Sequence, residues 1–228
     1  MQKFSKLGYQ RWQTELFQEE WFAKVFVQVM GALARPIYNW AWEIMREDLQ
    51  HAQVIGDVGC GNGLMSRRVA SELQDKHFHL VEPSAAQLQA GTSVRKKIGT
   101  KHQVTTHNCM AEDIPLPDQS LDVLYTTGSI NLWTDPARGL MQCKRVLKPG
   151  GILWLFDQRP CNTVPLAMDA LFKKRVFGLG IPGYPVEQVI DFAQEVGLHS
   201  PAVVENMSLY GLRWIIEPEA PEEAAETP

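Results

Sequence analysis

The sequence has few cysteines and no long apolar run, and these absences exclude several classes of protein. Its four cysteines lie far apart and form no C-x-x-C pair, so neither a structural zinc site nor a disulfide framework is expected. No uninterrupted apolar stretch approaches the roughly 20 residues that cross a bilayer. The first residues contain no apolar core of signal-peptide length. We therefore expect a reduced, cytoplasmic protein with no membrane segment and no bound metal.

A large excess of basic residues is also missing. The formal net charge is -4, and the segment 217–228 contributes five Glu and no Lys or Arg to it. The rest of the chain is therefore close to neutral, which gives no electrostatic reason to expect nucleic acid as a partner. The acidic segment 217–228 is rich in Pro and Ala and is predicted to be disordered.

Apolar patterns with strand spacing and helix spacing alternate along residues 51–216. This alternation predicts an α/β fold with a doubly wound, Rossmann-like, mostly parallel sheet. Two closely spaced strands near the C-terminus are expected to pair as an antiparallel edge hairpin. The predicted strands are 54–58, 78–81, 103–107, 121–126, 152–156, 202–207 and 209–216. The predicted helices are 64–75, one that starts at Ser84, 136–147 and 186–196.

Two segments depart from this alternation. Residues 1–50 contain two apolar helical stripes separated at Arg35-Pro36, because the residue before a proline is disfavoured in the α region. They predict an N-terminal helical extension or lid, whose aromatic rings either pack on the sheet or line a substrate pocket. Residues 158–185 are rich in Pro and Gly around a helical piece at 166–177, which is typical of an insertion or lid.

The most informative motif, Asp57-Val58-Gly59-Cys60-Gly61-Asn62-Gly63, follows the first apolar strand directly. A strand, a glycine turn and a helix start allow a backbone to approach a bound nucleoside cofactor closely. Leu64 stands where the dinucleotide pattern G-x-G-x-x-G requires its last glycine, so the spacing argues against NAD. The carboxylate of Asp57 would repel a pyrophosphate and suits a cationic ligand, such as a sulfonium with an amino-acid tail. The alternative is a tight turn that needs its glycines for geometry alone.

Three further motifs follow at the ends of predicted strands. Glu82-Pro83 ends the second strand, where a carboxylate can accept hydrogen bonds from both hydroxyls of a ribose. Residues 110–118 form a turn after the third strand, rich in Pro and Asp. Residues 125–133 cover the end of the fourth strand and the next loop, where ligands gather in doubly wound sheets.

In this order the motifs resemble those of the class I S-adenosylmethionine-dependent methyltransferases. The resemblance is closest to the small-molecule, type 11 branch that includes the ubiquinone and menaquinone biosynthesis enzymes, and it covers about residues 50–157. It implies S-adenosyl-L-methionine as the cofactor. Relatives often have Asp or Asn in place of Met110, whose thioether would instead pack on the adenine. The implied cofactor contacts are Asp57, Gly59, Cys60, Gly61, Gly63, Glu82, Pro83, Met110, Ala111, Glu112 and Thr127.

The resemblance predicts an enzyme that moves a methyl group by in-line displacement to a small-molecule acceptor. The cofactor is already activated, so the protein mainly has to align donor and acceptor, and no catalytic base is predicted. Asn131, Trp133 and Trp40 are candidates for contact with the substrate. The fourth-strand loop has neither an Asn/Asp-Pro-Pro-aromatic motif nor a Pro-Cys pair, which argues against the methylation of adenine or cytosine in DNA.

Other functions remain as alternatives. The chain could bind S-adenosylmethionine without catalysis, or modify RNA together with a partner. A nicotinamide-dependent oxidoreductase on a similar sheet is disfavoured by Leu64. His77 and His79 lie on one face of the second strand, but no third ligand is in view, so they do not predict a metal site.

Overall fold

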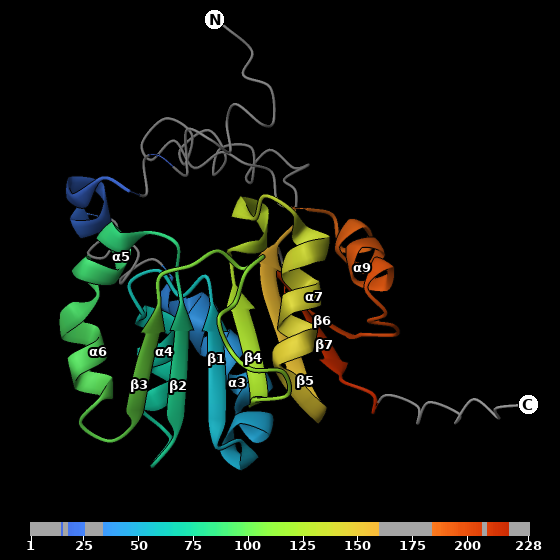
Figure 1. Cartoon of the computed structure of the whole chain (residues 1–228), viewed down its shortest axis with the longest axis horizontal. Helices are drawn as coiled ribbons and strands as arrows, with labels where there is room; N and C mark the ends of the chain where they lie inside the picture. The colour runs from blue at the N-terminus through green and yellow to red at the C-terminus, as the bar shows by residue number, and fades with distance from the viewer. Residues whose placement is uncertain (1–14, 16–17, 26–33, 160–183, 207–208, 219–228) are drawn as a thin grey trace, which may run out of the picture.

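A seven-stranded sheet forms the centre of the computed structural model, which describes residues 15, 18–25, 34–159, 184–206 and 209–218 (Figure 1). The strand order is β3-β2-β1-β4-β5-β7-β6. The first five strands run parallel, while β7 is antiparallel to both β5 and β6. The prediction of a doubly wound, mostly parallel sheet with an antiparallel edge hairpin is confirmed. The strands are β1 (Val54–Val58), β2 (His77–Val81), β3 (Gln103–His107), β4 (Leu121–Thr127), β5 (Leu147–Gln158), β6 (Ala202–Asn206) and β7 (Leu209–Ile215).

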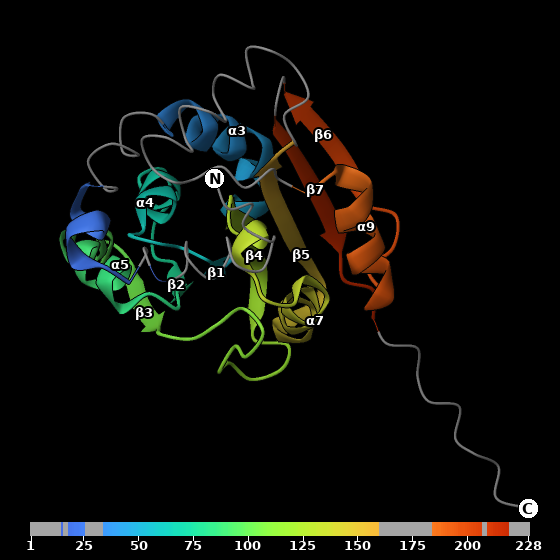
Figure 2. The same ribbon diagram turned by 90° about the horizontal axis from the view of Figure 1, so that it is seen from above.

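Helices cover both faces of this sheet (Figure 2). Alternate residues of β5 point to opposite faces, so Leu155 packs in the cluster with α7 and α9, while Phe156 packs in the cluster with α3 and α4. One face carries α3 (Arg35–His51), α4 (Leu64–Ala70) and α6 (Thr92–Ile98), with α5 (Ala85–Ala90) beside them. The other face carries α7 (Pro136–Val146) and α9 (Val186–Glu195), and η1 (Ile130–Leu132) follows β4.

Helix α3 belongs to the packed layers of the domain. Its side chains Met45 and Leu49 are fully buried, in the same cluster as the core of α4. The carboxylate of Asp48 accepts hydrogen bonds from Trp154 on β5 and from Arg213 on β7. The second predicted helix of the N-terminal extension is thus fastened to the sheet.

Several predicted boundaries are wrong by a few residues. Helix α4 ends at Ala70 and does not reach residue 75, because the Ser71 hydroxyl bonds back to the carbonyl of Arg68. Strand β5 begins at Leu147, five residues earlier than predicted, and its pairing with β4 shifts register near Leu121. Gly150 allows this irregular start through a left-handed conformation, with a φ of 78°.

The expectation that Arg35 would leave the helical region before Pro36 is also wrong. Arg35 begins α3, so the proline lies in the first turn, where its missing amide hydrogen is not needed. By contrast, α9 ends within one residue of the predicted boundary, shortly before Gly197, which has a left-handed φ of 72°. The predicted helix at 166–177 and nearly all of the predicted disordered tail lie outside the described residues. Among those residues, no helix is long and apolar enough to cross a bilayer.

Candidate cofactor site

The glycine turn lies at the carboxyl end of β1, next to the point where the chain order reverses between β1 and β4. Gly59, Gly61 and Gly63 all have left-handed φ values, of 74°, 55° and 81°. A Cβ on Gly59 would lie 2.4 Å from the Ser129 hydroxyl, whereas a Cβ on Gly61 would meet no atom within 4 Å. Gly59 therefore fits tightly against the loop after β4, while Gly61 presents bare backbone to open space.

Asp57 lies immediately before this turn and is 1% exposed. One carboxylate oxygen, Oδ2, accepts a hydrogen bond from the hydroxyl of Ser66, in the first turn of α4. Burial raises the pKa of Asp57 to about 7, although hydrogen bonds from Ser66 and Tyr125 act in the opposite direction. Its surroundings therefore favour the neutral carboxyl group unless a cationic group lies beside it.

Glu82 is a second buried carboxylate, at the end of β2, and it is 8% exposed. Its Oε2 accepts a hydrogen bond from the amide of Gly61 and its Oε1 from the amide of Ser84, both at 2.9 Å. Burial raises the pKa of Glu82, while these two amides lower it. Each oxygen keeps further acceptor capacity, so a fixed carboxylate can still bind two hydroxyl groups.

Asn108, directly after β3, holds the backbone at Glu82-Pro83, a role that the sequence did not predict. The Asn108 amide donates to the carbonyl oxygens of Glu82 and Pro83, both at 2.9 Å. A polar residue directly after a strand was the only signal for this role. Ser84 caps the start of α5, as predicted, by accepting a hydrogen bond from the amide of Gln87.

Residues 108–120 connect β3 to β4 without a helix (Figure 2). Arg145 on α7 holds this connection by donating to the carbonyl oxygens of Ile114 and Leu116, at 2.7 and 2.8 Å. Met110 is partly buried, and Ala111 and Glu112 are buried. The Glu112 carboxylate accepts a hydrogen bond from the amide of Asp135, so it faces the start of α7.

The loop after β4 supplies the other side of the site. Gly128 has a left-handed φ of 63° and open space at its Cβ position. The buried hydroxyl of Thr127 has no hydrogen-bond partner within the described part of the chain. Ser129, another residue that the sequence reasoning missed, bonds to Thr126 and to the carbonyl of Val58. The end of β4 is thereby fastened to the end of β1.

The three candidate substrate residues differ in their positions. Trp133 is 5% exposed in the core beside α7, and its indole donates to Ser129 at 3.2 Å. Asn131 is also buried, and its amide donates to Asp157 and accepts from the backbone of Tyr184, both at 2.9 Å. Trp40 on α3 is half-buried, with its ring edge-to-face with Phe156 at 5.6 Å.

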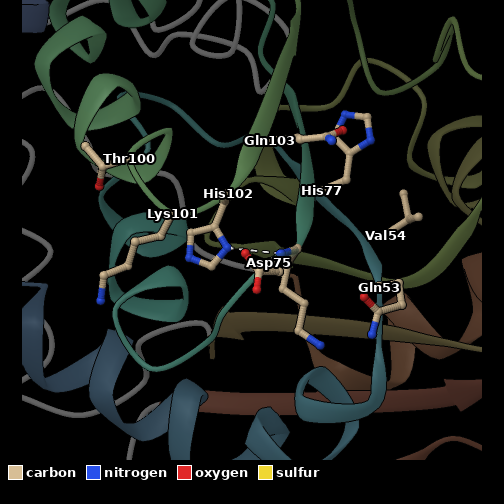
Figure 3. A pocket seen from close by; sticks show the side chains of 9 residues that line it. Gln53, Val54, Asp75, His77, Thr100, Lys101, His102 and Gln103 are labelled. Atoms are coloured by element: carbon tan, nitrogen blue, oxygen red, sulfur yellow. Dashed lines mark hydrogen bonds between the residues drawn. The ribbon is translucent and has the colours of Figure 1, made fainter.

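A separate pocket of about 440 Å³ opens at the amino ends of β1, β2 and β3 (Figure 3). His102 accepts a hydrogen bond from the amide of Lys76, and the Lys76 ammonium donates to the carbonyl of Gln50 at the end of α3. This pocket lies at the edge of the sheet opposite the glycine turn. Its polar side chains Lys76 and His102 bond to backbone carbonyls at the ends of α3 and α4. It is lined by Gln53, Val54, Asp75, Lys76, His77, Thr100, Lys101, His102 and Gln103.

The central part of the chain is similar to known methyltransferases. Residues 56–155 match the family model described as a methyltransferase domain. The chain is 30% identical over 142 residues to 2-methyl-6-phytyl-1,4-hydroquinone methyltransferase 1 of Oryza sativa subsp. japonica, a match that covers 59% of this chain and 41% of the relative. It is 27% identical over 124 residues to dimethylglycine N-methyltransferase of Parasynechococcus marenigrum, covering 54% of this chain and 44% of the relative. The chain thus spans about two fifths of the length of these curated relatives.

The same fold occurs among solved structures. A putative S-adenosyl-L-methionine-dependent methyltransferase from Methanococcus maripaludis aligns with a TM-score of 0.71 at 18% identity, over 89% of this chain and 95% of that one. These matches agree with the four motifs at the ends of β1, β2, β3 and β4. Residues 56–155 are similar to methyltransferase domains, and the fold is that of the solved methyltransferase from Methanococcus maripaludis.

Proposed function

We propose that this chain binds S-adenosyl-L-methionine at the glycine turn and transfers its methyl group by in-line displacement to a small-molecule acceptor. The observation that carries this proposal is a pair of buried carboxylates at the glycine turn: Asp57 directly precedes the turn, and Glu82 bonds to the bare backbone of Gly61. The names of the two relatives, which specify a hydroquinone and dimethylglycine, support an acceptor of small size.

The residues at the turn fit the cofactor. The carboxyl group of Asp57 would hold the amino group, because it is buried and no cation among the described residues bonds to it. Glu82 would hold the ribose hydroxyls, since two amides already fix its carboxylate. A Cβ would meet open space at Gly61 in the turn and at Gly128 in the loop after β4. The remaining proposed contacts are Gly59, Cys60, Gly63, Pro83, Met110, Ala111, Glu112 and Thr127.

When bound, the cofactor supplies an activated methyl group on a sulfonium. The task of the protein is then to align donor and acceptor, and such positioning is worth about 7–11 kcal/mol in well-ordered sites. Ser129 serves this task by fastening the loop after β4 to β1. Asn131 and Trp133 stabilise the same loop through their hydrogen bonds to Asp157 and Ser129. Half-buried Trp40, which packs against Phe156, is proposed to line the acceptor side of the site.

We propose that residues 51–216 form the methyltransferase domain and that residues 1–50 precede it as a helical extension, whose helix α3 packs on the sheet. The near-neutral charge outside the acidic segment supports a protein that acts without nucleic acid or a membrane. We propose a cytoplasmic location on the same grounds of composition.

Calorimetric titration with S-adenosylhomocysteine and, separately, with NADH tests the proposed cofactor. We expect S-adenosylhomocysteine to bind with one site per chain and NADH to give no signal. Absence of S-adenosylhomocysteine binding, or tighter binding of NADH, would contradict the proposal.

A further inference from the structure

Two hydroxyl groups hold the buried carboxyl group of Asp57 from behind the glycine turn. Asp57 on β1 and Tyr125 on β4 stand opposite each other in the register of the parallel pair. The Ser66 hydroxyl donates to Oδ2 of Asp57, and the Tyr125 hydroxyl donates to Ser66 Oγ at 3.3 Å. None of the three is more than 1% exposed. The orientation of the carboxyl group is therefore set by a chain of two hydroxyls.

Among the described residues, no positively charged side chain bonds to Asp57, although a buried carboxylate normally requires such a partner. Ionisable groups face it from each neighbouring element, namely Tyr38 on α3, Cys60 in the turn, Glu82 after β2 and Tyr125 on β4. The phenols and the thiol are neutral at pH 7, since burial raises the pKa of each, and Glu82 is an acid.

A basic residue on α6, Arg95, acts on the neighbouring thiol of Cys60 and not on Asp57. Without a ligand, Asp57 therefore keeps its proton up to near-neutral pH, because burial raises its pKa to about 7. A cationic group placed beside it would supply the missing charge.

We propose that binding of the cofactor amino group beside Asp57 is coupled to the release of one proton from the Asp57 carboxyl group, and that Ser66 and Tyr125 are its positioning residues. This inference rests on the proposed function. The ammonium stabilises the ionised carboxylate, so the carboxyl proton leaves to solvent when the ligand binds. Cofactor affinity then rises by up to about tenfold per pH unit below pH ~7 and levels off above it.

Proton release can be measured directly by calorimetry. S-adenosylhomocysteine is titrated into the protein between pH 5.5 and 8.5, in buffers that differ in ionisation enthalpy, and the dependence of the heat on the buffer gives the protons released. We expect about one proton at pH 6 and almost none at pH 8.5. Asp57→Asn should abolish the release, with folding checked by thermal denaturation.

A second ligand, which lacks the amino group, tests the proton release on the unmodified protein. Methylthioadenosine contains the nucleoside and its sulfur but lacks the amino-acid part. It brings no ammonium to Asp57, so we expect it to bind with no proton release and with an affinity that does not change with pH. Release of a proton by methylthioadenosine would contradict the assignment to the amino group.

The positioning role predicts a shift in the pH profile. Ser66→Ala and Tyr125→Phe each remove a hydrogen bond that favours the ionised carboxylate, so the midpoint of the affinity profile should move up by about one pH unit. Ser71→Ala, at the C-cap of the same helix, and Tyr210→Phe, another buried tyrosine, should leave the midpoint unchanged. An equal loss of affinity at every pH would mean that Ser66 and Tyr125 are merely structural.

The two proposals fail in different ways. S-adenosylhomocysteine that binds tightly, with no proton release and no pH dependence, overturns the proton coupling and leaves the proposed function intact. Failure of S-adenosylhomocysteine to bind at any pH contradicts the proposed function itself.

Discussion

The carboxylate of Glu82 joins the end of β2 to the glycine turn, because its Oε2 accepts the amide hydrogen of Gly61 at 2.9 Å. The same side chain fixes the start of α5 through the amide of Ser84. One buried acid thus sets the relative positions of the two segments that the cofactor would contact.

Gly61→Leu should abolish binding of S-adenosylhomocysteine, because the new side chain would enter the open space beside the turn. It should also cost about 1–2 kcal/mol of stability, since Gly61 has a φ of 55°. Gly150→Leu is the matched control, because Gly150 also has a left-handed φ and open space but lies at the start of β5. Calorimetry should show binding by the control alone; retained affinity in Gly61→Leu would place the cofactor elsewhere.

Glu82→Gln should weaken both the fold and the site. The amide group of Gln would set a second N–H against the amide of Gly61 or of Ser84, which costs about 1–3 kcal/mol. We expect the affinity for S-adenosylhomocysteine to fall at least about tenfold, because one acceptor for the ribose is lost. Glu72→Gln, in an exposed pair with Arg68, should change neither property appreciably. Unaltered affinity in Glu82→Gln would exclude the assigned ribose contact.

Asp57 should make the ligand-free protein less stable as pH rises from about 4 to about 7. Its pKa is raised in the folded state, so the folded protein holds more protons than the unfolded chain in this range, and the free energy of unfolding falls with pH. His79, whose pKa is lowered to about 4 by burial and neighbouring histidines, contributes the opposite slope between about 4 and 6.5.

Because the contributions of Asp57 and His79 oppose each other, the contribution of Asp57 is obtained by comparing the free energy of unfolding of Asp57→Asn with that of the unmodified protein. The stability of Asp57→Asn minus that of the unmodified protein should grow by up to about 4 kcal/mol across this window and stay constant above it. Denaturant unfolding at several pH values measures it. A difference that is flat from pH 4 to pH 7 would mean that Asp57 is ionised throughout.

Asp48→Asn should destabilise the attachment of α3 to the sheet. The Asp48 carboxylate accepts two hydrogen bonds from Arg213, at 2.8 and 2.9 Å, and one from Trp154 at 2.8 Å. Loss of the charge-assisted pair should cost about 1.5–3 kcal/mol in denaturant unfolding. Glu43→Gln, which breaks only the exposed pair with Arg46 on the same helix, should cost less than about 0.5 kcal/mol. Equal effects of the two variants would contradict the role of Asp48 as the anchor of α3.

Local patterns in the sequence were sufficient to predict the doubly wound, mostly parallel sheet, the glycine turn and the acid at the end of β2. Each of these depends on residues that are adjacent in sequence, such as Asp57 and Gly59, or on the alternation of strand and helix. The contact of Tyr125 with Ser66 depends instead on which residue of β4 stands opposite Asp57. Apolar periodicity specifies that a strand exists but not its register with a distant strand.

Aromatic residues illustrate the same limit. Trp133 and Trp40 were both predicted to contact the substrate, and both lie near the carboxyl edge of the sheet. Trp133 is almost fully buried with its indole bonded to Ser129, while Trp40 is half-buried against Phe156. The exposure of each ring depends on how η1 and α3 pack against the sheet. The number and positions of aromatic residues in the sequence give no information about that packing.

The most direct test of methyl transfer follows label from methyl-labelled S-adenosylmethionine into a cell extract that contains the protein. We predict that label enters the low-molecular-weight fraction with the unmodified protein and with Gly150→Leu, and that none enters with Gly61→Leu. Label that appears only in RNA, or no label in any fraction despite tight cofactor binding, would contradict a small-molecule methyltransferase.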